Sequence, residues 1–281
     1  MIKILTDSTC DLPPTWFNRY NISAIPINIQ FGLETFQEGV NITPDTFYRR
    51  IQTEGVLPTT SQPSVGEFCQ IYEALAADGS EILSIHVTSK LSGAWQSAVL
   101  AARQLNDKVK IRVVDSLTGS TGLGLMAREA AQLAAAGLSI EEIVLRLERR
   151  RSQIQVFIIL EDLGYARMSG RVGRLRELLA SLLNVKPIVG VDQGALIPLE
   201  RVRSRQKGFE RMLALAEAQV GQAPVHVGLV HALAQANAEN LLTQIQQRLN
   251  CQDTFVTDLA LSLAVHFGPG AIGFAAYPAT G

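Results

Sequence analysis

The chain has 281 residues, enough to bury one large hydrophobic core or two ordinary ones. Its 25 Lys and Arg residues and 26 Asp and Glu residues give a net charge of −1 at pH 7, so nucleic acid is not expected as its main partner. Charged residues make up only 18% of the chain and hydrophobic residues 47%, which leaves apolar side chains for a deep core or an apolar cavity.

The cysteines and the N-terminal sequence indicate a compartment. Cys10, Cys69 and Cys251 are scattered, and they form no CxxC motif and no Cys/His pair with zinc spacing. The N-terminal sequence turns polar at Asp7, too early for a secretory signal, and no apolar run reaches membrane-spanning length. We therefore expect a cytoplasmic protein with no integral membrane segment and no bound metal.

Short apolar runs alternate with helical patterns in the first half of the chain. Strands are predicted at residues 2–5, 23–30, 82–87 and 110–114. Helices are predicted after Thr43-Pro44, after Ser64 with Glu67 in capping-box spacing, and at residues 94–105 and 123–136. Because strand and helix alternate, we expect a mainly parallel sheet with helices on both faces.

The pattern changes in the second half of the chain, after a helix that starts with the Ser139–Glu142 capping box. Strands at 155–160, 225–231, 254–259 and 271–278 are joined by helices and by a hairpin that turns at Gln193-Gly194, and an amphipathic helix is predicted at 171–183. The prediction is an α/β fold of two domains: a parallel-sheet domain at residues 1–154 and an α+β domain with a mixed or antiparallel sheet at 155–281.

Three strands of the first domain end in turns that carry hydroxyl groups: Asp7-Ser8-Thr9, Thr88-Ser89 and Asp115-Ser116. In open α/β sheets ligands bind beyond the carboxyl ends of the strands, where helix N-termini also present free N–H groups. A polar rim above an apolar body is suited to a small anionic group. Each of these residues could instead be a simple helix cap.

The stretch TSKLSGAWQSA places Ser92 in a turn between a strand and a helix. The serine could act as a nucleophile with His266 and Asp7 or Asp115, could bind an anion, or could cap the helix. The chain contains no G-x-S-x-G elbow, which weighs against the nucleophile.

Other cofactor motifs fail in their context. The stretch GLGLMA fits a dinucleotide fingerprint, but it does not follow a strand directly and no acidic residue ends a second strand about 20 residues on. No P-loop, H-E-x-x-H or EF-hand motif occurs. His226 and His231 lie five residues apart on one strand, so they face opposite sides. No cofactor is expected.

Two further elements stand out. Residues 58–64, PTTSQPS, form a second hydroxyl-rich loop before a helix. His266 ends a short helix before the tight turn Gly268-Pro269-Gly270. It could be a charge that stabilises the helix C-terminus, or a donor directed at a buried acid.

Six stretches taken together resemble the DegV family, in the family's order and over essentially the whole chain. They are DSTCDLP, TSQPS, TSKLSGAWQSA, DSLTGSTGLGLMAREAA, SGRVG and HFGPGAIG. Each motif is weak alone, but the combination is specific. The chain departs from the family pattern at Ala94-Trp95, where Thr-Tyr is more usual, and at Ser169, where a second glycine is usual.

The resemblance implies a protein that holds one long-chain fatty acid, of about 14 to 18 carbons, in an apolar tunnel between two domains. Thr60 and Ser92 would hydrogen-bond the carboxylate, with Ser61, Gly93 and His266 beside them. The family also implies a partner, a fatty-acid kinase that phosphorylates the presented carboxylate for phospholipid synthesis. The residues of this chain that contact the kinase would be Arg171 and Arg203. The protein itself would then be a lipid-binding protein and not an enzyme.

The physical chemistry agrees with that implication. Burying ~16 carbons at ~0.8 kcal/mol per methylene stabilises a complex by on the order of 10 kcal/mol. A buried carboxylate needs hydrogen-bond donors. The segments that contain Thr60, Ser92 and His266 offer hydroxyls, N–H groups and a histidine, but no lysine or arginine except Lys90. Two alternatives stay open: a hydrolase or transferase that uses Ser92, and a regulatory protein that responds to lipid.

Overall fold

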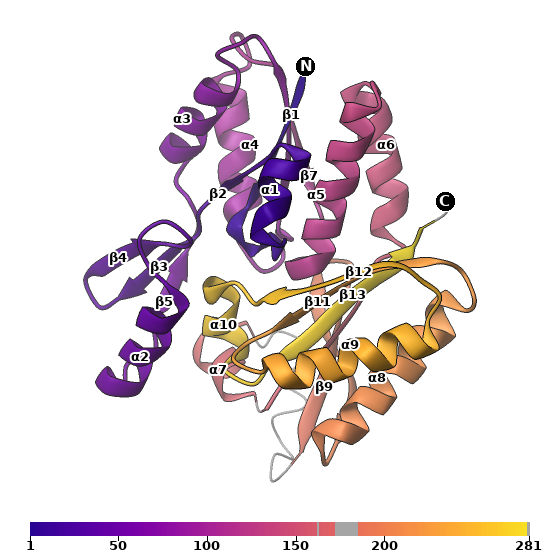
Figure 1. Ribbon diagram of the computed structural model, residues 1–281. Helices are drawn as coiled ribbons and strands as arrows, with labels where there is room; N and C mark the ends of the chain where they lie inside the picture. The colour runs from indigo at the N-terminus through magenta and orange to yellow at the C-terminus, as the bar shows by residue number, and fades with distance from the viewer. Residues whose placement is uncertain (162, 172–184, 280–281) are drawn as a thin grey trace.

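The computed structural model describes residues 1–161, 163–171 and 185–279 (Figure 1). Its first sheet is parallel, with the strand order β2-β1-β6-β7. The strands are β1 (Ile2–Asp7), β2 (Ile22–Ile25), β6 (Glu81–His86) and β7 (Ile111–Asp115). The helices around it are α1 (Pro14–Tyr20), α3 (Val65–Leu75), α4 (Ala94–Gln104), α5 (Ser120–Ala135) and α6 (Ile140–Arg151). The predicted parallel sheet is confirmed.

Helices cover both faces of this sheet because neighbouring strand residues point to opposite sides. Leu5 and Ile82 pack with the side chains of α3 and α4, whereas Ile4 and Leu83 belong to the larger apolar cluster around α5 and α6. This alternation explains why the strands read as continuous apolar runs in the sequence.

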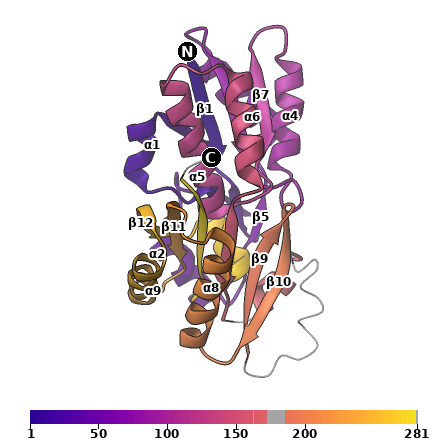
Figure 2. The same cartoon turned by 90° about the vertical axis from the view of Figure 1, so that its right-hand side faces the viewer.

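The second sheet is mixed, with the order β10-β9-β8-β13-β11-β12. Its strands are β8 (Gln155–Ile159), β9 (Lys186–Asp192), β10 (Ala195–Val202), β11 (Val225–His231), β12 (Cys251–Asp258) and β13 (Ile272–Pro278). Strands β11 and β12 are parallel and the other neighbours antiparallel. Helices α8 (Arg205–Val220) and α9 (Gln235–Arg248) cover one face, and the short helices α7 (Gly164–Met168) and α10 (Leu261–Phe267) pack together at one side (Figures 1 and 2).

The two sheets share an apolar core. Val156 and Val230 of the second sheet belong to the same cluster of buried side chains as Ile4 and Leu123 of the first part of the chain. The carboxyl ends of the parallel strands lie toward the second sheet, and the hydroxyl of Thr121 donates to the carbonyl of Gly228 across the join, at 2.9 Å. The boundary at residues 154 and 155 stays a prediction.

A third, small sheet has the order β4-β3-β5 and stands beside α10 (Figure 1). It consists of β3 (Asn28–Phe31), β4 (Glu34–Gln37) and β5 (Thr59–Ser61), with α2 (Pro44–Glu54) between β4 and β5. The prediction of one strand at residues 23–30 was wrong. Pro26 has no N–H to donate to a ladder, so β2 ends at Ile25 and β3 begins in another sheet. The prediction of a loop at 58–64 was also wrong in part, since residues 59–61 form β5.

Local signals in the sequence hold in the structure. Thr43 caps α2 with Pro44 in its first turn, and the capping boxes Ser64–Glu67 and Ser139–Glu142 are both formed. The hairpin of β9 and β10 turns at Gln193 and Gly194, whose φ angles of 47° and 81° are typical of a type I′ turn. The predicted helix at 171–183 lies outside the described residues, except for Arg171.

No helix in the described part of the chain combines the length and apolar character needed to cross a membrane.

Candidate functional site

A cavity lies between the carboxyl ends of the parallel strands, the second sheet and α10. It contains about 850 Å³ of empty space, part of which is open to solvent. Its apolar wall includes Val156 and Ile158 of β8. All five residues predicted to bind a carboxylate line it, together with one of the two predicted partner residues: Thr60, Ser61, Ser92, Gly93, His266 and Arg171. The chain thus brings together side chains that lie more than 200 positions apart in the sequence.

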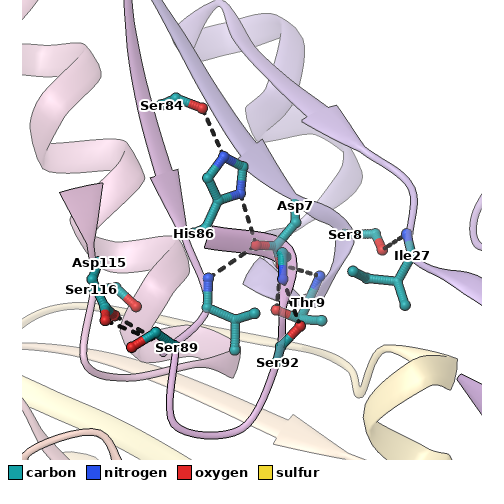
Figure 3. A network of polar contacts seen from close by, with 12 residues as sticks. Asp7, Ser8, Thr9, Ile27, Ser84, His86, Ser89, Ser92, Asp115 and Ser116 are labelled. Carbon is teal, nitrogen blue, oxygen red and sulfur yellow. Dashed lines mark hydrogen bonds and ion pairs between the residues drawn. The ribbon is translucent and has the colours of Figure 1, made fainter. Parts of the chain in front are cut away.

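The hydroxyl-bearing turns do meet at one edge, and their carboxylates hold the loops of the cavity in place (Figure 3). Asp7 is fully buried and accepts hydrogen bonds from the N–H of Val87 at 2.9 Å and from the hydroxyl of Thr9 at 2.5 Å. Asp115 accepts from the N–H of Ser89 at 3.3 Å. Because these carboxylates are already paired with donors of the protein, they shape the site without facing the cavity themselves.

Ser92 is placed to donate a hydrogen bond into the cavity. Helix α4 starts at Ala94 with Gly93 as its N-cap, so Ser92 is not the N-cap residue that the sequence suggested. The Ser92 oxygen still accepts the N–H of Ala94, at 3.2 Å (Figure 3). That contact uses the oxygen as an acceptor and leaves the hydroxyl proton free for a ligand. Capping and anion binding are therefore compatible.

Thr60 and His266 form a pair across the cavity. The Thr60 hydroxyl lies 3.2 Å from Nε2 of His266. Burial, together with the positive charge of Arg171, lowers the pKa of His266 to about 4. The imidazole is neutral at pH 7, so His266 is not a charge that stabilises the end of α10. Among the described residues, its hydrogen-bond partner is the hydroxyl of Thr60.

The neutral imidazole can direct the Thr60 hydroxyl toward a ligand. When Nε2 carries the proton, it donates to the Thr60 oxygen, and the hydroxyl proton of Thr60 is then free for an acceptor in the cavity. Nδ1 of His266 is buried and has no hydrogen-bond partner among the described residues. The pair therefore offers a neutral donor to an anion.

The two predicted partner residues differ in their position. Arg171 lines the cavity and donates to the carbonyl of Ser169 at 2.7 Å. Arg203 is exposed in the turn after β10 and does not line this cavity. The sequence did not anticipate that Arg171 would lie so close to the predicted carboxylate site.

Two smaller cavities share lining residues with the main one. One of them shares its polar residues and the other shares mainly apolar residues. An outer vestibule of about 490 Å³ shares Thr60, Arg171 and His266 with it. An inner extension of about 330 Å³ runs between α5 and the second sheet, and it is walled largely by apolar side chains such as Phe267 and Phe274. Polar groups therefore stand at the mouth and apolar groups at depth, which is the arrangement that an amphiphile with one long tail requires.

The structure contains a Ser-His-Asp chain, but it is closed to substrates (Figure 3). Ser84 lies 2.7 Å from Nε2 of His86, and Nδ1 of His86 lies 3.0 Å from Asp7. All three side chains are fully buried, and none of them lines the main cavity. The hydroxyl of Tyr72 donates to Ser84 at 2.9 Å, so the chain of contacts is a buried structural network.

The nucleophile hypothesis for Ser92 lacks its base. Asp7, one of the two acids proposed for it, is paired with His86 and not with His266. His266 is paired with Thr60, and Ser92 is bonded to the backbone of Ala94. Among the described residues, no histidine is hydrogen-bonded to Ser92. This arrangement can bind an anion but has no assembled nucleophile.

Sequence reasoning missed two residues at the site. Ser262 of α10 lines the cavity, and its N–H and hydroxyl groups donate hydrogen bonds to Glu38. Neither lies in a motif with a recognised chemistry. Glu38 becomes visible only through contacts between residues 224 positions apart, and no local pattern could have indicated it.

Comparisons with known proteins identify the family of this chain. The family described as "Uncharacterised protein, DegV family" matches residues 1–279. A DegV domain-containing protein of Deinococcus radiodurans is 34% identical over 281 residues, which cover 99% of this chain and 98% of the relative. A "Fatty acid-binding protein" of Thermotoga maritima is 31% identical over 279 residues, covering 97% and 96%.

Solved structures share the whole fold. The structure "Fatty Acid Binding of a DegV family Protein from Thermus thermophilus" superposes with a TM-score of 0.93 at 30% identity and covers 99% of both chains. DegV of Bacillus subtilis, described as a fatty acid binding protein, superposes with a TM-score of 0.90 at 28% identity, again over 99% of both chains. The present chain belongs to the DegV family.

Proposed function

We propose that this protein binds one long-chain fatty acid, of about 14 to 18 carbons, with its carboxylate at the vestibule and its tail between the sheets. One observation carries the proposal: the cavity lined by Thr60, Ser92 and His266 shares the apolar residues Val156, Ile158 and Phe267 with the inner apolar cavity. Ser61 and Gly93 complete the carboxylate site. The Thermotoga and Thermus relatives, which are described as binding fatty acids, support a fatty acid as the ligand.

The energetics of such a complex are favourable. Each buried methylene contributes ~0.8 kcal/mol, so a tail of ~16 carbons stabilises the complex by on the order of 10 kcal/mol before the entropy of association is subtracted. Hydroxyl groups of Thr60 and Ser92 would satisfy the carboxylate without a tight ion pair to a lysine. Arg171 at the mouth adds a favourable charge that stays partly solvated.

We further propose that the bound acid is presented to a fatty-acid kinase in the cytoplasm. The carboxylate would lie next to the vestibule, where a partner can reach it. Met168, which lines the vestibule, is 59% exposed, and Arg171 lies beside it, so the rim combines an apolar contact with a positive charge. Arg203 would extend the contact. The acyl phosphate made by the kinase would enter phospholipid synthesis, and this chain would carry out no chemistry itself.

A calorimetric titration tests the binding proposal. Delipidated protein should bind palmitate with a stoichiometry of one, and hexadecanol, which has the same tail but no carboxylate, should bind more weakly. Equal affinity for the two would contradict the assignment of the polar residues. A fluorophosphonate probe addresses the alternative, because stoichiometric labelling of Ser92 would support a serine hydrolase or transferase in place of a binding protein.

A further inference from the structure

Helix α10 forms one wall of the cavity but has no cap of its own. Ser262, His266 and Phe267 of this helix all line the cavity. Its N-cap residue is Ala260, which has no side chain that could accept a hydrogen bond from the first turn. The free N–H groups of a helix start need acceptors, and in a buried helix these must come from elsewhere in the protein.

Two carboxylates from distant segments supply these acceptors. One oxygen of Glu38 accepts the N–H of Ser262 at 2.8 Å, and the other accepts the Ser262 hydroxyl at 2.7 Å. An oxygen of Asp11 accepts the N–H of Ala260 at 2.8 Å. Glu38 is only 7% exposed and Ser262 only 2%, so these contacts are largely shielded from water.

Glu38 directly follows the strand β4 and therefore lies at the end of a strand of the small sheet. Its own N–H donates to the carbonyl of Ile27 at 3.0 Å, and its carboxylate also accepts the hydroxyl of Ser8. Ser8 in turn accepts the N–H of Ile27, at 2.9 Å (Figure 3). Glu38 is thus fixed on one side by the start of the small sheet and on the other side holds α10.

The same small sheet carries Thr60 on β5, so two hydrogen-bonded pairs of residues join this part of the chain to α10: Glu38 with Ser262 and Thr60 with His266. Ser262 and His266 are four residues apart, which corresponds to about one helical turn and ~6 Å along the axis. A ligand would affect the two contacts differently. A bound carboxylate would compete for the hydroxyl of Thr60, whereas the buried Glu38 contact does not face the vestibule.

We propose that Glu38 is a positioning residue for fatty-acid binding, which holds α10 against the small sheet and keeps His266 opposite Thr60 when the ligand enters. This proposal rests on the proposed function of the cavity. A carboxylate is suited to the role because its two oxygens accept several hydrogen bonds at once, here from the N–H and hydroxyl of Ser262 and from the hydroxyl of Ser8.

The electrostatics around Glu38 support a structural hold and not an ion pair. Burial raises the pKa of Glu38, hydrogen bonds from Ser8 and Ser262 oppose that effect, and the nearby charge of Asp7 adds to it. Its hydrogen-bond donors among the described residues are hydroxyl and N–H groups, with no Lys or Arg among them. A neutral glutamine can therefore keep much of the arrangement, because its carbonyl accepts the N–H of Ser262 and its amide donates to hydroxyl oxygens.

The test compares Glu38→Ala with Glu38→Gln and a matched control, Glu129→Ala. Glu129 is a poorly exposed glutamate of α5 that is paired with Arg150 of α6, and it does not line the main cavity, its vestibule or its inner extension. Two readouts are measured: palmitate affinity of the delipidated proteins by calorimetry, and the pKa of His266 in the ligand-free proteins by NMR with histidine labelled at Cε1. His266→Gln assigns the resonance.

Glu38→Ala should weaken palmitate binding about tenfold, near the lower end of the effect of losing a charged hydrogen bond, because Glu38 acts on the ligand only through α10. It should also raise the pKa of His266 from about 4 toward its ordinary value of 6.5, because a loosened α10 admits water. Glu38→Gln should keep the palmitate affinity within about threefold of the wild type, a change well below the loss expected for Glu38→Ala. It should also keep the pKa of His266 near its wild-type value. Glu129→Ala should leave both at the wild-type values.

A folded Glu38→Ala with unchanged palmitate affinity and an unchanged His266 pKa would overturn the proposal. If Glu38→Ala does not fold, Ser262→Ala removes only the hydroxyl contact, and the same two readouts should move in the same directions by smaller amounts; no movement in either would equally overturn it. If the wild type does not bind palmitate, the proposed function fails, while the His266 titration still decides whether Glu38 holds α10.

Discussion

Replacing Ser92 by alanine is the sharpest test of the carboxylate site. The hydroxyl proton of Ser92 is free to donate into the cavity, since its oxygen accepts the N–H of Ala94 at 3.2 Å. A hydrogen bond to a charged group is worth about 1.5–3 kcal/mol, so Ser92→Ala should weaken fatty-acid binding by about 10- to 150-fold. The contribution of the tail, on the order of 10 kcal/mol, should not change.

Calorimetry of delipidated protein measures this effect, with two controls. Ser89→Ala changes a serine in the same loop that does not line the cavity, and it should keep the wild-type affinity. Hexadecanol should lose less affinity than palmitate in Ser92→Ala, because it lacks the charge that the hydroxyl stabilises. An unchanged palmitate affinity in Ser92→Ala would refute the assignment. Equal losses for palmitate and hexadecanol would show that the substitution damages the tunnel and not the carboxylate site.

Two other predictions concern charge. The pKa of His266 is about 4 in the folded protein against 6.5 unfolded, so the unfolded state binds the extra proton first and stability is lost as pH falls through that window. The free energy of unfolding should drop by about 3 kcal/mol more in the wild type than in His266→Gln between pH 7 and pH 4, by urea denaturation; parallel curves would contradict the buried neutral imidazole. Charge reversal at Arg203, which does not line the cavity, should abolish acyl phosphate formation with a fatty-acid kinase and leave bound lipid in place, whereas charge reversal at Arg171 should also weaken lipid binding, because Arg171 lines the carboxylate site. Loss of bound lipid in the Arg203 variant would indicate misfolding, and normal phosphorylation in both variants would exclude these arginines from the contact.

Much of the fold could be predicted because its signals are local. Capping boxes, the Pro44 helix start and the Gln193-Gly194 turn depend on residues within a few positions of each other, and the structure contains all of them. The parallel order of the first sheet followed from the alternation of apolar runs with helices. The error at residues 23–30 came from reading Pro26 as part of a strand, although its missing N–H marks the passage from one sheet to another.

The site could be predicted only in part, since motifs name residues but not the contacts that hold them. Thr60, Ser92 and His266 each stood in a motif, and they line one cavity. The neutral state of His266 depends on burial, which the sequence around it does not reveal. Glu38 supports the site from a stretch without any motif, through a contact with Ser262 that exists only in the folded chain.

The central claim is that the cavity holds one long-chain fatty acid. Mass spectrometry of an organic extract from the purified protein tests it most directly, with the protein concentration measured in the same sample. The extract should contain a stoichiometric amount of fatty acid, of about 14 to 18 carbons, and this amount should fall when Thr60 and Ser92 are both replaced by alanine. A protein that carries no fatty acid and binds none when palmitate is added would contradict it.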